Sequence, residues 1–258
     1  MEQRWALITG ASAGLGVEFA RLAAAEGWSL VLAARRRSEM EALAATLPVT
    51  CVVIDIDLSQ PRSGDVLWEM ANEGRQIDLL INNAGLGAHG PFGTGETDER
   101  EDTSIAVNVV AYTDLLQRAV ADFRQRGIKG QVLNVASLAG YMPGPGMAVY
   151  HATKAYALSL SDAVHSEAKR DGITVTALCP GATRTEFFDA AEVKRTWLMT
   201  LSTMGDAASV ARAGWDGLRA GRRRVVPGIM NKFSMIFARL LPSAVMTPLV
   251  GRLLAKNL

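Results

Sequence analysis

The sequence is poor in cysteine, in aromatic residues and in net charge. Its 258 residues include only two cysteines, 6% are aromatic, and the formal net charge is +1. Cys51 and Cys179 lie in apolar, strand-like runs. We interpret them as buried free thiols, with neither a disulfide framework nor a metal-ligand spacing. The balanced charge gives the whole chain no nucleic-acid signature, so we expect no metal site and no nucleic-acid partner.

Long hydrophobic runs are also missing. The first apolar stretch, Trp5–Ile8, is too short for the core of a signal peptide and leads directly into a glycine-rich turn. No stretch of residues 222–258 reaches the ~18–20 uninterrupted apolar residues of a membrane span, because prolines and basic residues break it. A cytoplasmic location is the resulting expectation.

Acidic residues are absent after Asp216, whereas eight basic residues follow it. The last 42 residues therefore carry +8 and residues 1–216 carry −7, which together give the total of +1. The basic, partly apolar tail 222–258 can lie on an anionic membrane surface, cover a substrate pocket or form a subunit interface. We favour packing or an interface and keep a peripheral membrane contact as the alternative.

Apolar residues make up 49% of the chain, ample for a large core, and gather in short runs. Six runs are nearly continuous in Ala, Val, Ile and Leu, which is typical of strands in a parallel sheet covered on both faces. The predicted strands are Trp5–Ile8, Ser29–Ala33, Thr50–Ile54, Leu79–Ile81, Gln131–Val135 and Thr174–Leu178.

Amphipathic stretches between these runs predict helices. The alternation of strands and helices predicts an α/β fold with a doubly wound parallel sheet. We find no internal repeat, low-complexity tract or linker, so residues 1–258 are expected to form a single domain. The predicted helices are Gly16–Glu26, Arg37–Thr46, Arg62–Glu73, Thr103–Arg126 and Ala148–Arg170.

A glycine-rich turn joins the first predicted strand to the first predicted helix. Residues 9–16 read Thr-Gly-Ala-Ser-Ala-Gly-Leu-Gly, which spaces the glycines as Gly-x3-Gly-x-Gly. Glycines let the backbone approach a diphosphate closely, and a helix N-terminus presents unpaired N–H groups to it. The position in the first strand–helix unit favours phosphate binding over a plain turn. A P-loop is excluded because no Gly-Lys-Ser/Thr follows.

Arginines, and no acidic residue, follow the second predicted strand. An acidic side chain there would bind the adenosine ribose 2′-hydroxyl, whereas Arg35 and Arg36 can pair with a 2′-phosphate. We therefore expect NADP(H) to be preferred over NAD(H). The alternative is that both arginines only solvate a helix start. Asp57, after the third predicted strand, is placed to touch the adenine, or else to cap a helix, as Ser59 equally can.

Tyr150 and Lys154 lie four residues apart in a predicted helix and so share one face. A nearby fixed cation lowers the pKa of a Tyr from its ordinary value of about 10. Ser137 follows a predicted strand and can hold a substrate oxygen beside the phenol. Tyr-x-x-x-Lys recurs by chance, so the pair gains weight only from the glycine-rich turn upstream.

Several motifs stand together in the order of a known family. Between the glycine-rich turn and Pro180-Gly181 come Asn82-Asn83-Ala84-Gly85, Asn108, Ser137 and the Tyr150/Lys154 pair. Over residues 5 to about 185 the chain closely resembles the short-chain dehydrogenase/reductase family in its compact single-domain form. The resemblance implies a Rossmann-type sheet of about seven parallel strands and an enzyme that interconverts a carbonyl and an alcohol with NAD(P).

The resemblance also implies roles for individual residues. Tyr150 would exchange a proton with the substrate oxygen, Ser137 would hold that oxygen, and Lys154 would bind the nicotinamide ribose and lower the pKa of the Tyr. Asn108 would kink its helix and hold a water that links Lys154 to solvent. Asn82 would support the centre of the sheet. The expected cofactor contacts, from the residues and the resemblance together, are Gly10, Ser12, Ala13, Gly14, Leu15, Gly16, Arg35, Arg36, Asp57, Leu58, Asn83, Ala84, Gly85, Tyr150, Lys154, Pro180, Gly181, Thr183 and Thr185.

Departures from the family pattern are small. Ala13 stands where many NADP-using relatives carry Arg or Lys, so the expected 2′-phosphate preference rests on Arg35 and Arg36 alone. His151 follows the Tyr where small residues are common, and we assign it to packing or hydrogen bonding. His89, alone in a glycine-rich loop, receives no role.

Two apolar segments are expected to determine the substrate specificity. They are the Gly/Pro-rich loop 138–147 and residues 184–205, and loops at the carboxyl ends of parallel strands are where such sheets bind ligands. We expect an apolar ketone or aldehyde, although these side chains can equally just close the core. The apolar side chains of the second segment are Phe187, Phe188, Trp197, Leu198 and Met199.

The function expected from these observations is an NADP(H)-dependent oxidoreductase that reduces an apolar carbonyl, with Tyr150 as general acid/base. A homodimer or homotetramer would form through helices 103–126 and 148–170, as in the family. The alternative is a catalytically silent NADP(H)-binding sensor or scaffold, against which the intact Ser137, Tyr150 and Lys154 count. A nucleotide-sugar epimerase is disfavoured, because those relatives have a shorter glycine spacing and a larger C-terminal substrate domain.

Overall fold

Seven parallel strands form one sheet in the computed structural model, which describes residues 3–187, 191 and 205–255. Their order across the sheet is β3-β2-β1-β4-β5-β6-β7. Strands β1 to β3 are added toward one edge of the sheet and β4 to β7 toward the other, so the strand order reverses between β1 and β4. This is the doubly wound α/β fold that the sequence predicts. The strands are β1 (Trp5–Thr9), β2 (Ser29–Ala34), β3 (Cys51–Asp55), β4 (Ile77–Asn82), β5 (Gln131–Val135), β6 (Thr174–Leu178) and β7 (Arg224–Val225).

The six strands predicted by position are confirmed, and so is the total of about seven that the family resemblance implies; the position of the seventh is a correction. We expected Arg224 to belong to the basic tail, but Arg224–Val225 forms β7 and pairs with Ala177–Leu178 of β6. A two-residue edge strand is too short to give a periodic pattern. The tail therefore begins after the sheet is complete.

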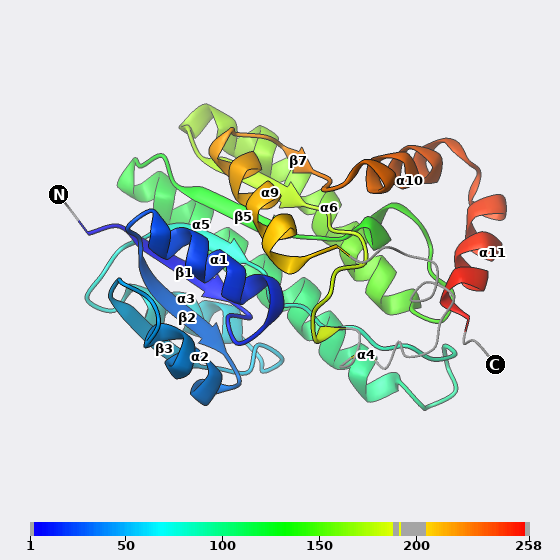
Figure 1. Cartoon of the computed structure of the whole chain (residues 1–258), viewed down its shortest axis with the longest axis horizontal. Coiled ribbons are helices and arrows are strands. Elements are labelled where there is room, and N and C mark those ends of the chain that lie inside the picture. Colours follow the sequence, from blue (N-terminus) through cyan, green and yellow to red (C-terminus); the bar gives the residue numbers. More distant parts are fainter. Residues whose placement is uncertain (1–2, 188–190, 192–204, 256–258) are drawn as a thin grey trace.

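Helices cover both faces of the sheet (Figure 1). One face carries α1 (Gly14–Ala25), α2 (Arg37–Ala44) and α9 (Ala207–Arg219), and α9 was not predicted. The other face carries α3 (Ser63–Asn72), α5 (Tyr112–Arg126) and α6 (Ala148–Ala168). The shorter elements are the helix α4 (Asp98–Ile105), the π-helical segment η1 (Ala106–Ala111), and the 3-10 turns η2 (Leu138–Tyr141) and η3 (Lys169–Asp171).

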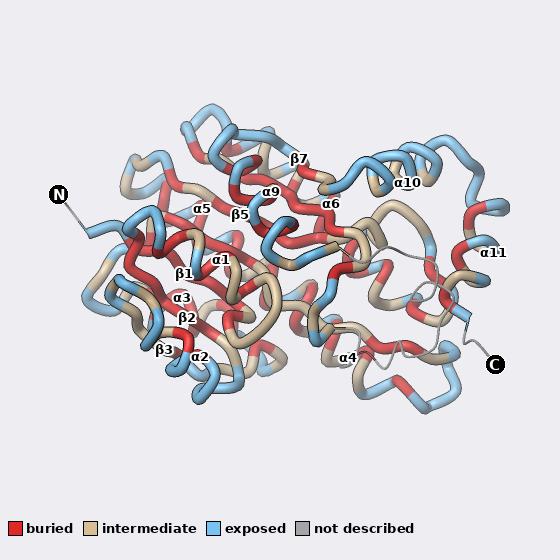
Figure 2. Tube along the Cα trace, viewed as in Figure 1, coloured by how far each residue is buried: buried red, intermediate tan, exposed pale blue. Residues whose placement is uncertain are grey.

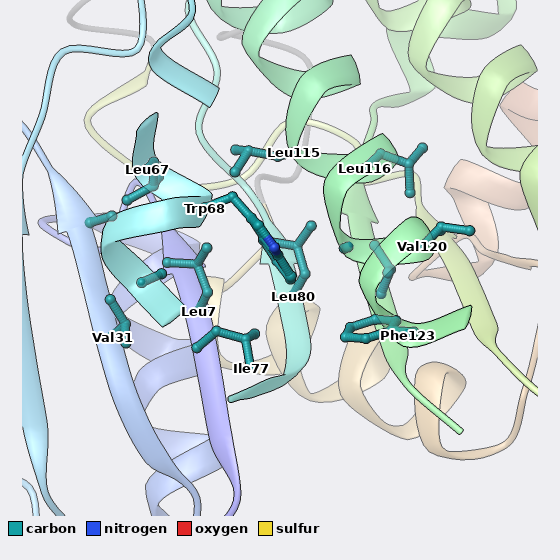
Figure 3. Close-up of a cluster of buried hydrophobic side chains, with 14 of the residues drawn as sticks. Leu7, Val31, Leu67, Trp68, Ile77, Leu80, Leu115, Leu116, Val120 and Phe123 are labelled. Atoms are coloured by element: carbon teal, nitrogen blue, oxygen red, sulfur yellow. The ribbon is translucent and has the colours of Figure 1, made fainter. Parts of the chain in front are cut away.

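Neighbouring residues of each central strand point into opposite cores. In β1, Leu7 belongs to the core beneath α3 and α5, whereas Ala6 and Ile8 belong to the core beneath α1 and α9. Figure 3 shows the first core, in which Trp68 of α3 and Phe123 of α5 meet edge to face with ring centroids 6.1 Å apart. Burial on both faces explains why the strands read as continuous apolar runs.

The predicted helix Thr103–Arg126 begins earlier and is interrupted. Helical structure starts at Asp98 and runs through α4, η1 and α5 to Arg126. The π-helical turns of η1 widen the helix around Asn108, which is 1% exposed. Such single-turn π segments are frequent at functional sites, and this one matches the kink that the family resemblance implies.

The tail forms two helices beyond the sheet, α10 (Ile229–Leu240) and α11 (Ser243–Leu254). Figures 1 and 2 show them at one end of the molecule, where α10 is largely exposed. The inner face of α11 buries Met246, Val250 and Leu254 against Met147. None of the described helices is long and apolar enough to span a membrane.

A glycine lets η2 lie directly against α6. A Cβ atom added to Gly140 would lie 2.5 Å from the main-chain oxygen of Lys154 and 2.6 Å from Cδ1 of Leu158. The first of these atoms is backbone, so a side chain at position 140 would push η2 away from the helix that carries Tyr150.

We expect Gly140→Ala to lower the free energy of unfolding by about 1–3 kcal/mol, the usual cost of overpacking a tight contact. Urea unfolding followed by circular dichroism measures this change. Gly205→Ala is the control, because its added methyl would lie 3.2 Å from a Val210 side-chain carbon and should cost less. An unchanged unfolding midpoint for Gly140→Ala would contradict the close approach.

Candidate active site

A cavity of about 1050 Å³ opens at the carboxyl edge of the sheet. Its walls come from the segments that follow β1, β2, β3, β4, β5 and β6, and from the tail helices. The strand order reverses between β1 and β4, so the cavity lies at the switch point where doubly wound sheets bind ligands.

The glycine-rich turn after β1 has the shape that a diphosphate requires. Gly10 and Gly14 adopt left-handed backbone angles, with φ of +65° and +54°. A Cβ on Gly16 would lie 2.1 Å from the Gly10 carbonyl oxygen, so only glycine fits. No side chain caps the N-terminus of α1, which leaves its first N–H groups for a ligand. The turn therefore fits a dinucleotide diphosphate.

Thr9 connects this turn to the loop after β4, a role that sequence reasoning missed. Its hydroxyl oxygen accepts hydrogen bonds from the backbone N–H groups of Asn83 and Ala84, both at 2.9 Å. Asn83 Nδ2 donates back to the Thr9 carbonyl at 2.8 Å. The side chain of Asn82 points away from this loop, since its amide nitrogen donates to the Tyr112 carbonyl at 3.0 Å.

The two predicted arginines lie at the mouth of the cavity with different surroundings. Arg36 donates to the Ser12 hydroxyl at 3.3 Å and forms an ion pair with Glu186 at 2.8 Å. Arg36 thus links the segment after β2 to the segment after β6. Arg35 is exposed and also lines the cavity.

Asp57 lines the cavity and does not cap a helix. Its carboxylate accepts hydrogen bonds from the Ser59 backbone N–H at 3.0 Å and from the Ser59 hydroxyl at 2.8 Å. The bond from the Ser59 N–H is the main reason that the pKa of Asp57 is lowered, and Arg35 adds attraction. Because α3 begins at Ser63, neither Asp57 nor Ser59 is its cap.

Tyr150, Lys154 and Ser137 meet in the same cavity. Tyr150 and Lys154 lie in the first two turns of α6, as their spacing predicts, and the Lys154 nitrogen is 5.8 Å from the centre of the Tyr150 ring. Lys154 is 5% exposed, and its ammonium group donates to the Val135 carbonyl at 3.1 Å. Ser137 lies just after β5, and its hydroxyl accepts a hydrogen bond from the Ala139 backbone N–H at 3.1 Å.

The protonation of the pair differs from the sequence expectation. Burial raises the pKa of Tyr150 to about 12, and the nearby Ser137 hydroxyl opposes this rise only in part. Burial also lowers the pKa of Lys154 to about 8. We expected Lys154 to lower the pKa of the phenol, but the low-polarity surroundings of both groups dominate. The Tyr is therefore held as a neutral phenol.

Asn108 lies directly behind Lys154. Its side-chain oxygen accepts from the Leu86 backbone N–H at 2.9 Å, and its nitrogen donates to the Leu86 carbonyl at 2.7 Å and to the Thr153 hydroxyl at 3.0 Å. A Cβ on Gly85 would lie 3.1 Å from Lys154 Nζ and 3.3 Å from Asn108 Oδ1. A small residue at position 85 therefore lets these two polar groups come close to the same loop.

The far wall of the cavity is apolar. Phe187 stacks at a tilt against Tyr150, with ring centroids 5.0 Å apart, and Met147 lies beside it in a common cluster with the tail. Trp197, Leu198, Met199 and Phe188, which we expected near the substrate, lie outside the described residues. The tail contributes more wall residues than expected, namely Met230, Phe237, Leu241, Met246, Leu249, Val250, Leu253 and Leu254.

Both histidines near the site hold backbone in place. His151 Nδ1 bonds to the Met142 carbonyl at 2.8 Å, in line with the packing role that we expected. His89 is different, because its Nε2 bonds to the Leu254 carbonyl at 2.8 Å. This hydrogen bond connects the loop after β4 to the end of α11. Its two partners are 165 residues apart in the sequence, so no local sequence pattern predicts it.

Nearly all of the predicted site residues line this one cavity. Gly16 and Asn108 do not; they lie behind its wall, where Gly16 packs on Gly10 and Asn108 supports Leu86. The predicted residues on the wall are Gly10, Ser12, Ala13, Gly14, Leu15, Arg35, Arg36, Asp57, Leu58, Asn83, Ala84, Gly85, Ser137, Tyr150, Lys154, Pro180, Gly181, Thr183 and Thr185.

Curated relatives match between about two thirds and four fifths of this chain. The chain is 34% identical over 180 residues to a very-long-chain 3-oxoacyl-CoA reductase of Phaeosphaeria nodorum, a match that covers 66% of this chain and 52% of the relative. It thus spans about half the length of the first curated relatives that it matches.

Solved structures match over almost the whole chain. A short-chain dehydrogenase from Sphingobium yanoikuyae in complex with NADPH superposes with a TM-score of 0.81 and 32% identity, covering 90% of this chain and 91% of the other. The bulky-bulky ketone specific alcohol dehydrogenase from Comamonas testosteroni gives a TM-score of 0.77 and 30% identity, covering 95% and 97%.

A family profile agrees with these relatives and with the geometry of the site. The profile described as short chain dehydrogenase matches residues 4–195, from the first strand to beyond the Tyr150/Lys154 pair. The sequence-based assignment is thereby confirmed, and the chain belongs to the short-chain dehydrogenase family.

Proposed function

We propose that the protein is an NADP(H)-dependent oxidoreductase that reduces an apolar ketone or aldehyde to the alcohol. The observation that carries the proposal is the meeting of Ser137, Tyr150 and Lys154 in one cavity with the glycine-rich turn. A turn that fits a diphosphate supports a dinucleotide, and the three polar groups lie where its reactive end would reach. The similarity to named reductases and dehydrogenases supports the same reaction class.

The proton is supplied by Tyr150. A phenol whose pKa is raised to about 12 stays protonated throughout the neutral range, so it is ready to donate to a carbonyl oxygen that gains negative charge. Ser137, which lines the same cavity as the phenol, would hold that oxygen within reach. A nicotinamide cofactor bound at the turn supplies the hydride.

Lys154 places a buried positive charge beside the phenol. Its ammonium group is fixed by the Val135 carbonyl, and it would stabilise the phenolate that remains after the proton has left. Asn108 keeps Leu86 and Thr153 in position behind it. These groups come from α6, η1 and the loop after β4, and hydrogen bonds join the three segments.

The apolar wall supports a substrate with large hydrocarbon groups. Phe187, Met147 and the tail residues Phe237 and Leu249 face the cavity, and a pocket of this kind binds by apolar burial with a few polar groups for orientation. The similarity to the Comamonas testosteroni alcohol dehydrogenase, which is specific for bulky-bulky ketones, supports the same choice.

The preference for NADP(H) rests on Arg35 and Arg36. Both line the cavity on the β2 side, where the adenosine ribose of a dinucleotide lies in this fold. Arg36 would exchange its ion pair with Glu186 for a 2′-phosphate, a stronger, doubly charged partner. The NADPH-bound relative from Sphingobium yanoikuyae supports this preference.

A homodimer or homotetramer fits the exposed apolar residues of the helices that we expected at an interface. Ile105 and Val110, in the helical stretch from α4 to α5, and Tyr156 on α6 are each exposed. Exposed large apolar side chains that gather on packed helices mark association surfaces.

Tyr150→Phe should reduce the turnover of a ketone by at least about a hundredfold, the usual contribution of a positioned general acid. NADPH binding should be almost unchanged, because the ring is retained. Steady-state NADPH oxidation and fluorescence titration measure the two effects. Tyr156→Phe, on the exposed face of the same helix, is the matched control. Full activity in Tyr150→Phe would refute the proposed mechanism.

The double variant Arg35→Ala/Arg36→Ala should weaken NADPH binding by more than tenfold, since each charge-assisted bond to a phosphate contributes about 1.5–3 kcal/mol. NADH binding should change little. Dissociation constants for both cofactors measure the preference. Arg37→Ala removes a neighbouring arginine that pairs with Asp55 and Glu41 and serves as the control. An equal loss of affinity for NADPH and NADH would show that the two arginines do not bind the 2′-phosphate.

Lys154 should make the stability of the cofactor-free protein depend on pH. Its pKa is about 8 in the folded protein and 10.5 in ordinary surroundings. Below pH ~8 both states are protonated and the full cost of burying the charge is present; between pH ~8 and ~10.5 the folded state loses its proton first. The free energy of unfolding should therefore rise over this window by up to about 3 kcal/mol relative to Lys154→Met.

Urea unfolding at several pH values, with each variant compared with the wild type, measures this rise. The exposed Lys129→Met variant should follow the wild type across the same window. A difference between wild type and Lys154→Met that stays constant with pH would show that Lys154 is not desolvated in the folded state.

A further inference from the structure

Helix α10 presents large apolar side chains to solvent along its whole length. None of its residues is buried. Ile229, Met230 and Leu240 are 71%, 72% and 75% exposed, and Phe233, Ile236 and Phe237 are also exposed. A helix that only covers a core turns its apolar residues inward, so this exposed stripe marks a contact surface.

These six side chains form a continuous stripe. With 3.6 residues per turn, positions 229, 230, 233, 236, 237 and 240 fall within an arc of about 120°. Asn231, Met235 and Ala238 occupy the opposite side of the helix and are only partly exposed. Figure 2 shows the helix at the edge of the molecule, separated from the buried sheet.

Basic residues border the stripe. Lys232 and Arg239 are seven residues apart, so both lie on the same edge of the helix, and both are exposed. Neither forms an ion pair with a described residue, and no Asp or Glu occurs after Asp216. The Arg239 guanidinium lies 5.4 Å from the centre of the Tyr141 ring in η2.

The other edge of the stripe opens onto the cavity. Met230 and Phe237 line the cavity, together with Ser234 one position further around the helix. Leu241, directly after α10, continues the same wall. The apolar surface of α10 is therefore continuous with the apolar half of the site.

We propose that α10 docks on an anionic membrane surface, with its apolar stripe in the interfacial region and its basic edge against the headgroups. A 12-residue helix with this pattern is suited to lie in the plane of the interface, and too short to cross the bilayer. A second copy of the chain is a poorer partner. Two such tails would bring like charges together with no acidic residue on either to pair them.

Docking would place the mouth of the cavity at the boundary between lipid and water. If the proposed reductase function holds, its apolar carbonyl would enter from the membrane, where it concentrates, past Met230 and Phe237. The docking surface itself does not depend on that function, because Phe233, Ile236 and Leu240 do not line the cavity.

Sedimentation with vesicles tests the docking surface. The full chain should pellet with vesicles of phosphatidylglycerol and phosphatidylcholine at low salt, and far less with phosphatidylcholine alone or at high salt. Phe233→Glu/Leu240→Glu should lower the partition coefficient at least tenfold, because two inserted side chains are lost. Lys232→Gln/Arg239→Gln should lower it about twenty-five-fold, since each basic residue near the surface contributes about fivefold.

Val66→Glu/Met70→Glu is the matched control. Both residues are 43% exposed on α3, away from the tail, and the variant has the same change in charge as Phe233→Glu/Leu240→Glu. It should bind vesicles almost like the wild type. Equal loss in both double variants would show that net charge, not the stripe, governs binding, and would overturn the proposal.

Two further measurements separate the remaining outcomes. Light scattering measures the oligomeric state of the protein. The proposal would be overturned if the wild type did not bind vesicles and instead formed a dimer, and if Phe233→Glu/Leu240→Glu dissociated that dimer. Turnover of a water-soluble ketone with NADPH, which this variant should retain, tests the reductase function separately. Turnover without vesicle binding would overturn the docking alone, and vesicle binding without turnover would support the docking and overturn the reductase function.

Discussion

The hydroxyl group of Thr9 joins the two loops between which the strand order reverses. It accepts hydrogen bonds from the N–H groups of Asn83 and Ala84 and so joins the turn that fits a diphosphate to the loop beside Lys154. Parallel sheets leave a crevice at this point for purely topological reasons. The Thr9 bonds give the crevice fixed walls, and Gly85, two residues after Asn83, then allows Lys154 and Asn108 to approach.

Burial has opposite consequences for the two central groups of the site. It keeps Tyr150 protonated and makes the charge of Lys154 costly. A cation held in such surroundings by the Val135 carbonyl lacks a carboxylate partner among the described residues. It is therefore poised to interact strongly with any negative charge that forms nearby, since electrostatic interactions are weakly screened there.

Much of the fold and most of the candidate site follow from local sequence patterns. Strands buried on both faces produce continuous apolar runs, and the cofactor turn and the Tyr150/Lys154 pair have fixed spacings on single elements. The features that the sequence did not predict depend on contacts between residues far apart in the chain. The two-residue β7 forms only beside β6, His89 finds its partner at Leu254, and the direction of the Tyr150 pKa shift depends on how tightly other segments enclose the ring.

The tail helices supply much of the apolar wall yet lie beyond the family match, which ends at residue 195. The glycine-rich turn and the Ser137, Tyr150 and Lys154 side chains thus lie within the matched part of the chain, and many residues of the apolar wall lie on the two helices that follow it. Under the proposed function, mutations in α10 and α11 would change which substrate is bound and leave the Ser137, Tyr150 and Lys154 group in place.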